Sequence, residues 1–160
     1  MSLLTTEIDS VKLTFDKEKT QENRTDYNIP CECQYCRNYY KNIDNSPEIK
    51  DFLSSFGIDY LRAEEIIPYD LGNDKDSPIC YNAYYCVFGS IDDEASLKKE
   101  AYTVSFRKSA EVNVGHKVTD DMFFVVLGIE LPYILEEERD MPIQSRIGRW
   151  FGRIKSVFCK

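Results

Sequence analysis

The sequence predicts an α+β fold, in which an antiparallel sheet of four or five strands packs with two N-terminal helices and a C-terminal helix. Short apolar segments occupy most of the second half of the chain, and their connections are mostly too short for helical crossovers, which favours an antiparallel meander. Two segments of the first half have helical periodicity. The chain has 160 residues, 42% of them apolar. We therefore expect a single domain over residues 1–160.

Alternating and continuous apolar patterns define the strands. The segment that begins at Val11 alternates apolar with polar residues, as a half-buried strand does. Residues 79–89 are apolar at both alternating sets of positions, which predicts a central strand covered on both faces. Pro68 cannot donate to a central ladder and predicts an edge strand. The expected strands are residues 11–16, 64–71, 79–89, 101–108 and 122–131.

The clearest helix signal lies at residues 47–56. Ser46 is a favourable N-cap, Pro47 suits the first helical position, and Gly57 suits a left-handed C-terminal cap. We expect another helix over about residues 33–43. The remaining N-terminal segments are predicted to lack regular structure: residues 1–10 as flexible or an expression scar, and the polar residues 17–30 as a loop.

Three cysteines lie within six positions at the start of the first predicted helix. Cys33 and Cys36 form a C-x-x-C pair, the spacing of two zinc ligands, and Cys31 adds a third thiol. No second C-x-x-C is present. Zinc prefers four ligands in structural sites, so the fourth would come from a carboxylate or from one of Cys80, Cys86, Cys159 and His116.

Two other interpretations of the cysteines remain open. A redox pair is favoured by a helix N-terminus, which lowers a thiol pKa, but the neighbouring Glu32 disfavours a thiolate. Packing is favoured by helical periodicity, because free cysteine behaves as a small buried hydrophobe. On a helix, one continuous face contains Cys33, Cys36, Tyr40 and Ile43. The sequence favours packing first, metal binding second and redox chemistry third.

The segment CECQYCRNYY, followed by PEIKDFLSSFGIDYLRAEEIIPYDL, resembles small uncharacterised proteins of Gram-positive bacteria (Firmicutes) and their mobile elements. Their pattern is a cysteine cluster with an Asn-aromatic pair, then a short helix that ends in a Phe/Leu-Gly-Ile/Leu-Asp sequence. The resemblance covers about residues 27–71. It implies a bacterial cytoplasmic protein, and the group has no established activity.

Charge and composition exclude several classes of protein. The net charge of −8 repels a nucleic-acid backbone, so we expect no nucleic-acid partner. No stretch approaches the ~18 consecutive apolar residues of a membrane span, and the N-terminus lacks the basic leader of a signal peptide. Without an export signal, the six cysteines are expected to be reduced thiols in a cytoplasmic protein.

The C-terminal residues 142–160 predict an amphipathic helix with an apolar arc and a basic flank. Residues 146–160 contain five bases and no acid. We expect this helix to complete the core on the protein's own acidic body, and the alternatives are a partner protein's groove or an anionic membrane surface. The candidate contact residues are Arg146, Arg149, Trp150, Phe151, Arg153 and Phe158.

The sequence contains no motif that identifies a catalytic reaction. His116 is the single histidine and lies in a turn-like segment with no nucleophile placed beside it. An enzyme is expected only if a cleft gathers His116 with carboxylates. We therefore expect a non-enzymatic accessory or immunity-type protein that acts through protein contact. The alternative is a structural zinc protein centred on Cys31, Cys33 and Cys36.

Overall fold

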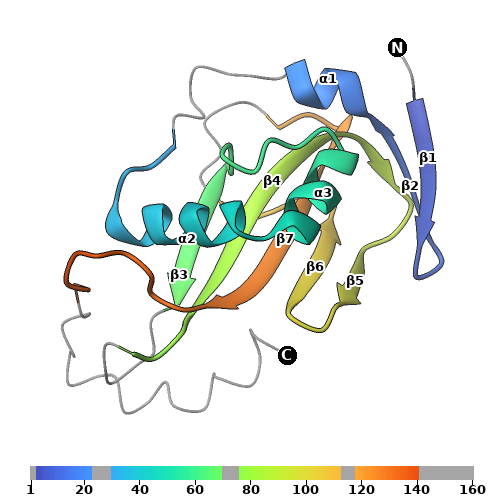
Figure 1. Cartoon of the computed structure of the whole chain (residues 1–160). Helices are drawn as coiled ribbons and strands as arrows, with labels where there is room; N and C mark the ends of the chain where they lie inside the picture. Colours follow the sequence, from blue (N-terminus) through green and yellow to red (C-terminus); the bar gives the residue numbers. More distant parts are fainter. Residues whose placement is uncertain (1–2, 23–29, 70–75, 113–117, 141–160) are drawn as a thin grey trace.

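The α+β class is confirmed by a computed structural model of the chain, which describes residues 3–22, 30–69, 76–112 and 118–140 (Figure 1). Within them the sheet has seven strands, more than the four or five predicted. The predicted helix over 142–160 lies outside these residues. In chain order the elements are β1 (Leu3–Ile8), β2 (Val11–Asp16), α1 (Lys17–Glu22), α2 (Gln34–Asp44), α3 (Pro47–Ser55), β3 (Glu65–Tyr69), β4 (Ile79–Ile91), β5 (Ala95–Lys98), β6 (Tyr102–Arg107) and β7 (Met122–Leu131).

The strand order differs from a simple meander. The sheet runs β1-β2-β4-β7-β6-β5, with β3 also pairing with β4, and every pair is antiparallel. Only β5, β6 and β7 follow one another as a meander. The long strand β4 instead pairs with β7 from Ile79 to Phe88, and its other edge pairs with β3 and β2. Pro68 lies on β3, whose pairing within the described residues is with β4, so the predicted edge position is confirmed.

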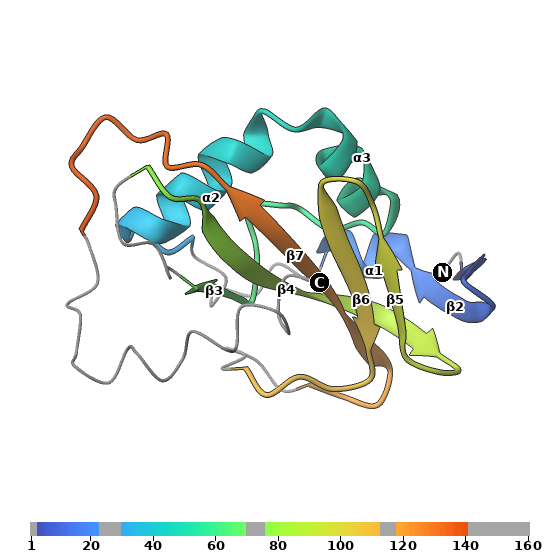
Figure 2. The ribbon, with the colours of Figure 1, turned by 90° about the horizontal axis from the view of Figure 1, so that it is seen from below.

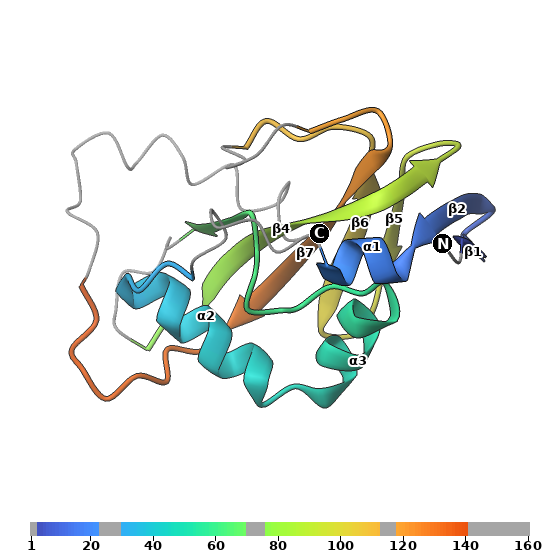
Figure 3. The same ribbon diagram turned by 90° about the horizontal axis from the view of Figure 1, so that it is seen from above.

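Helices α2 and α3 cover one face of the sheet, and the core lies between them (Figures 1 and 3). On β4 the side chains of alternate residues from Ile79 to Val87 are almost fully buried against these helices. The ring of Phe56 joins the layers, with ring centroids 4.8 Å from Phe15 and 5.9 Å from Phe106. The opposite side chains of β4 are only half-buried. The predicted covering of this strand on both faces is therefore complete on the face towards the helices and only partial on the opposite face.

Helix α3 forms where its sequence signals predict it. The N–H of Ile58 donates to the carbonyl of Leu53 at 3.1 Å, and Gly57 follows the helix with a φ of 82°. This is the predicted left-handed glycine cap. Ser46 is the N-cap residue as predicted, but its hydroxyl makes no capping bond and donates to the carbonyl of Asn42 at 3.0 Å instead. Ser46 therefore joins the end of α2 to the start of α3.

Strands β1 and β5 occupy segments where the sequence predicted no strand. A two-residue turn joins β1 to β2, and both of its residues, Asp9 and Ser10, have positive φ angles. Such turns favour hairpins but are usually signalled by Asn-Gly or Asp-Gly. The side chains of β1 are exposed apart from a half-buried Ile8, and β5 is a short edge strand that pairs with β6. Strand β1 lacks the alternating apolar pattern that reveals a half-buried strand, and β5 has it over only four residues, Ala95–Lys98.

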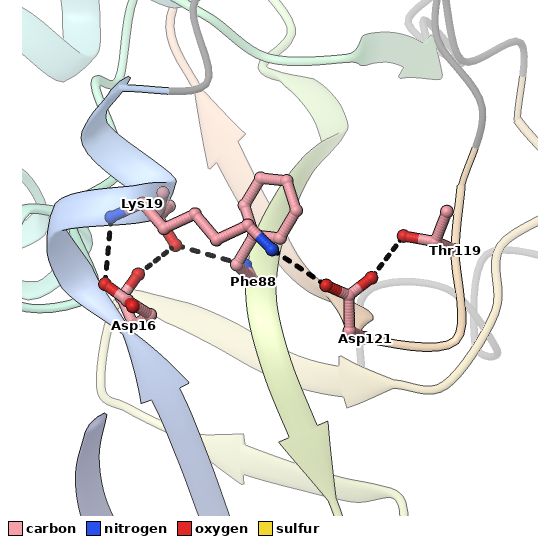
Figure 4. A network of polar contacts seen from close by, with 6 residues as sticks. Asp16, Lys19, Phe88, Thr119 and Asp121 are labelled. Carbon is pink, nitrogen blue, oxygen red and sulfur yellow. Dashed lines mark hydrogen bonds and ion pairs between the residues drawn. The ribbon is translucent and has the colours of Figure 1, made fainter. Parts of the chain in front are cut away.

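Helix α1 replaces the start of the predicted 17–30 loop, and tertiary hydrogen bonds hold it (Figure 4). The carboxylate of Asp16 accepts the N–H of Lys19 at 2.9 Å, which caps the helix. The hydroxyl of Thr20 donates to the Asp16 carbonyl and accepts the N–H of Phe88 on β4. The ammonium of Lys19 lies 4.0 Å from the Phe88 ring centroid and 2.8 Å from a carboxylate oxygen of Asp121. Phe88 and Asp121 are distant in sequence, so the polar sequence of α1 does not reveal these two partners.

The ion pair at α1 predicts a measurable pH dependence. The Lys19 ammonium and then the Thr119 hydroxyl hold the pKa of Asp121 below its usual value. The stabilisation is therefore present above the ordinary range of an aspartate, and it is lost as the pH falls through the lowered pKa. We expect Lys19→Met to raise the Asp121 pKa towards its ordinary value in an NMR titration of the carboxyl carbon, whereas Lys12→Met leaves it unchanged. An unaltered Asp121 titration in Lys19→Met would contradict this pairing.

Candidate functional site

The cysteine cluster lies at the N-terminus of α2, whose start decides how each thiol is placed. The helix begins at Gln34, one residue later than predicted, so Cys33 is the N-cap residue with extended backbone angles of φ −64° and ψ 157°. Its side chain is exposed, whereas Cys36, one turn into the helix, is buried. The packing interpretation is therefore correct for Cys36 and wrong for Cys33. The buried face of α2 includes Tyr39, which is fully buried, rather than the half-buried Tyr40.

The three sulfur atoms of the cluster converge. The Sγ atoms of Cys31, Cys33 and Cys36 all lie within 4.8 Å of one another, and the N–H of Cys33 points to the Cys31 sulfur at 3.5 Å. Cys31 is exposed like Cys33. Among the described residues, these three cysteines are the one group of metal-ligand side chains gathered in this way. The structure thus brings together the three candidate ligands that their spacing indicated.

A buried tyrosine pair anchors α2 to the sheet below the cluster. The hydroxyl of Tyr85 on β4 donates to the carbonyl of Tyr60 at 3.0 Å and lies 2.9 Å from the hydroxyl of Tyr39. Burial raises the pKa of both phenols, so both stay neutral. Both groups are hydrogen-bonded, which offsets the cost of burying them. The helix that carries Cys36 is therefore fixed at its middle by core contacts.

A segment after β7, residues 132–140, lies along α2, and we call it the strap (Figure 2). Three side-chain amides of α2 bind its backbone, and the amide of Asn42 donates to the Pro132 carbonyl at 3.1 Å. Asn38 donates to the Pro132 carbonyl at 3.1 Å and accepts the N–H of Ile134 at 2.8 Å. Gln34 donates to the Glu138 carbonyl at 2.9 Å and accepts the N–H of Asp140 at 2.8 Å. The strap therefore runs antiparallel to the first turns of α2, beside the cluster.

The sequence interpretation missed these amides as structural residues of the site. The signal that points to one of them is the Asn-aromatic pair, Asn38 and Tyr39, in the resemblance pattern. In the structure Asn38 binds the strap, and Tyr39 packs in the core. No local pattern indicates Gln34, because its partners lie 104 to 106 residues away along the chain.

The surroundings give the exposed and buried thiols of the C-x-x-C pair opposite pKa shifts. Partial burial acts to raise the pKa of Cys33. Hydrogen bonds from the Cys36 N–H, from the other two thiols and from the Tyr35 N–H outweigh this effect, so the pKa of Cys33 lies below its usual value. Burial and then the neighbouring Cys33 and Cys31 raise the pKa of Cys36 well above its usual value. Cys86, on β4 outside the cluster, has its pKa raised to about 12 by burial.

The strap carries three consecutive carboxylates. Glu136, Glu137 and Glu138 are all exposed on it. The guanidinium of Arg37 pairs with the Glu137 carboxylate, and its Nε donates to the Glu32 carbonyl at 2.9 Å. The charge of Arg37 is thus matched by a carboxylate, and the remaining acids of the strap make this part of the surface negative.

Apart from the cluster, a concave surface lies on the sheet face opposite α2 and α3. It is a polar groove of about 770 Å³ lined mainly by β4, β5, β6 and β7, and the ion pair of Arg107 with Glu94 lies in it. Hydrogen bonds to Arg107 and to the N–H of Lys108 hold the pKa of Glu94 below its usual value. His116 lies outside the described residues, so the groove does not test the predicted cleft of a histidine with carboxylates. The six candidate contact residues from Arg146 to Phe158 also lie outside them.

The other cysteines correct one expectation. Cys31, Cys33, Cys36 and Cys86 are free thiols, but Cys80 is disulfide-bonded, so the prediction of reduced thiols throughout is wrong at this position. No helix among the described residues is long and apolar enough to cross a membrane.

Comparison with known proteins found no matching family model, no matching curated protein and no matching solved structure. The resemblance to proteins of Gram-positive bacteria therefore stays a prediction.

Proposed function

We propose that the protein binds a soft metal ion, zinc in the first instance, through the thiolates of Cys31, Cys33 and Cys36. One observation carries this proposal: their sulfur atoms lie within 4.8 Å of one another. Zinc–sulfur bonds of about 2.3 Å in a tetrahedral site place sulfur atoms about 3.8 Å apart. The sulfur atoms therefore need to approach by about 1 Å or less, which small side-chain rotations achieve.

The arrangement of the three cysteines supports such a closure. Cys36 is buried on a helix anchored to the sheet, whereas Cys31 and Cys33 are exposed and free to adjust. Thiolates select soft ions such as Zn²⁺ and Cu⁺ over the oxygen-seeking Mg²⁺ and Ca²⁺. The acidic strap favours the approach of a cation.

Three protein ligands leave one position of a tetrahedral zinc ion for another donor. Zinc sites with three protein ligands usually hold a water molecule or an external ligand at the fourth. We infer that the ion is exchangeable, unlike one enclosed by four cysteines. Of the fourth ligands considered from the sequence, Cys80, Cys86 and a carboxylate are not part of the group among the described residues, and Cys159 and His116 lie outside those residues.

The predicted accessory or immunity-type role through protein contact remains a second proposal. This role depends on the basic residues and the aromatic residues of 142–160, which lie outside the described residues. A cytoplasmic location and a bacterial source likewise remain predictions, and a protein that binds zinc is compatible with each of them.

Titration with cobalt(II) tests the metal site. We expect the reduced full-length protein, freed of metal by a chelator that is then removed, to bind one equivalent and to develop the near-ultraviolet thiolate-to-cobalt absorption. Zinc should displace the cobalt. Each of the substitutions Cys31→Ser, Cys33→Ser and Cys36→Ser removes a ligand. Loss of a group that only supports a metal ligand already lowers metal affinity about 10–100-fold, so we expect each variant to bind cobalt at least about 10-fold more weakly.

Cys86→Ser is the matched control, because it removes a free thiol that lies outside the cluster. We expect this variant to bind cobalt as the unmodified protein does. Binding that survives the triple serine substitution, or the absence of any thiolate-to-cobalt band, would refute the proposed site.

A further inference from the structure

We propose that the metal-free cluster is also a thiol–disulfide exchange centre, in which Cys33 attacks a small-molecule disulfide and Cys36 resolves the product. The proposal uses the sulfur atoms of the proposed metal site but does not depend on metal binding. It is carried by the unequal placement of the two thiols. Cys33 is exposed at the helix N-cap, whereas Cys36 is buried behind it, with its sulfur within 4.8 Å.

The backbone geometry permits a disulfide between Cys33 and Cys36. They lie three residues apart at the first turn of α2, and a helix rising 1.5 Å per residue brings such Cα atoms to about 5 Å. Disulfides form when the Cα atoms lie about 4.4–6.8 Å apart. Cys31 and Cys33 are separated by a single residue, and an extended backbone places such Cα atoms at about 6.6 Å, near the upper limit. The C-x-x-C pair is therefore the favoured disulfide.

Burial assigns the order of the two steps. An external disulfide reaches the exposed sulfur of Cys33, and the Cys36 sulfur is shielded from it. The thiolate of Cys33 attacks one sulfur of the disulfide RSSR, the S–S bond breaks, and a mixed disulfide forms as RS⁻ leaves and takes a proton. The thiolate of Cys36 then attacks the Cys33 sulfur and releases the second RSH. The protein thereby loses two electrons and two protons, and RSSR is reduced to two RSH.

Oxidation of this pair has a consequence for the metal site. A disulfide between Cys33 and Cys36 removes two of the three proposed ligands and leaves the exposed Cys31 thiol alone. The metal-bound state and the oxidised state therefore exclude each other. An oxidant releases the ion, and a bound ion protects the thiols.

The test uses the full-length protein in a chelator, with glutathione disulfide as oxidant. After alkylation of free thiols, the unmodified protein should contain, besides the disulfide of Cys80, one that links Cys33 to Cys36, with Cys31 alkylated. Chymotrypsin cleavage after Tyr35 separates Cys36 from Cys31 and Cys33, and fragmentation of the linked peptides by tandem mass spectrometry shows which of these two is bonded to Cys36. In Cys36→Ser the second step is blocked, and we expect about one glutathione per chain to accumulate on Cys33. Cys86→Ser should oxidise as the unmodified protein does.

Two outcomes would overturn the proposal. One is a Cys36→Ser protein that gains no glutathione at Cys33 under conditions that oxidise the unmodified protein. The other is a principal disulfide that involves Cys31 instead of the Cys33–Cys36 pair. The chelator makes both results independent of metal binding. A second experiment replaces the chelator with zinc, added before the oxidant. If oxidation is slowed at least about 10-fold, which is the lower end of the ligand effect expected above, the result supports the metal site. An unchanged rate of oxidation counts against the metal site alone.

Discussion

Replacement of Asn38 by alanine is expected to lower the free energy of unfolding by roughly 2–4 kcal/mol, because the buried Tyr81 hydroxyl and the half-buried N–H of Ile134 lose their partner, while the Pro132 carbonyl keeps its bond from Asn42. The side chain of Asn38 is fully buried. Its amide donates to the Tyr81 hydroxyl at 3.0 Å and to the Pro132 carbonyl, and its oxygen accepts the N–H of Ile134. Each buried polar group left unsatisfied costs about 1–3 kcal/mol. Urea denaturation measures the change.

Asn45→Ala provides the matched control for this prediction. Asn45 is the exposed C-cap residue of the same helix, and exposed substitutions usually change stability by less than about 0.5 kcal/mol. Since Asn38 joins the strap to α2 beside the cluster, we also expect Asn38→Ala to bind cobalt more weakly while Asn45→Ala does not. Equal unfolding free energies for the two variants would show that the strap contacts contribute little to stability.

Gly57→Ala is expected to destabilise the protein by at least about 2 kcal/mol, for two separate reasons. The φ of Gly57 is 82°, a left-handed conformation that costs a residue with a Cβ about 1–2 kcal/mol. A Cβ at this position would also lie 2.3 Å from the carbonyl oxygen of Lys17, a backbone atom at the start of α1. Relief of this contact requires α1 and the end of α3 to move apart. Thermal and urea denaturation both report the loss.

One further variant separates these two reasons, and another serves as a control. Gly57→Asn tolerates the left-handed conformation better than alanine does, but it brings the same Cβ towards Lys17. If the close approach dominates, Gly57→Asn is about as unstable as Gly57→Ala. Ser54→Ala, an exposed position in the last turn of α3, should change stability by less than about 0.5 kcal/mol. A Gly57→Ala protein as stable as the unmodified one would contradict both arguments.

The sequence predicted the composition of the candidate site better than its shape. The spacing of Cys31, Cys33 and Cys36 indicated a possible ligand set, and the sulfur atoms do converge. Whether each thiol is buried depends on the residue at which α2 begins, since a shift by one position turns Cys33 from a helical residue into the N-cap. Helix boundaries are the least certain part of a local pattern. The helical face predicted for packing was therefore wrong at its first residue.

The sequence by itself determined the elements whose local chemistry is self-sufficient. Pro47 and Gly57 mark the two ends of α3, and the apolar residues of β4, β6 and β7 predict strands because burial of alternate side chains drives their formation. The predicted α+β class follows from these elements.

The tertiary structure alone decided which distant segments meet. Helix α1 depends on hydrogen bonds and an ion pair with β4 and Asp121, and the strap depends on amide contacts more than 90 residues apart in sequence. The pairing of β4 with β7, in place of a simple meander, is also non-local. Contacts of this kind leave no periodic trace in either segment, because each needs only one suitably placed polar group or backbone edge. The convergence of three sulfur atoms at the start of α2 is local, since the cysteines lie within six positions, whereas the burial of Cys36 depends on how the helix packs.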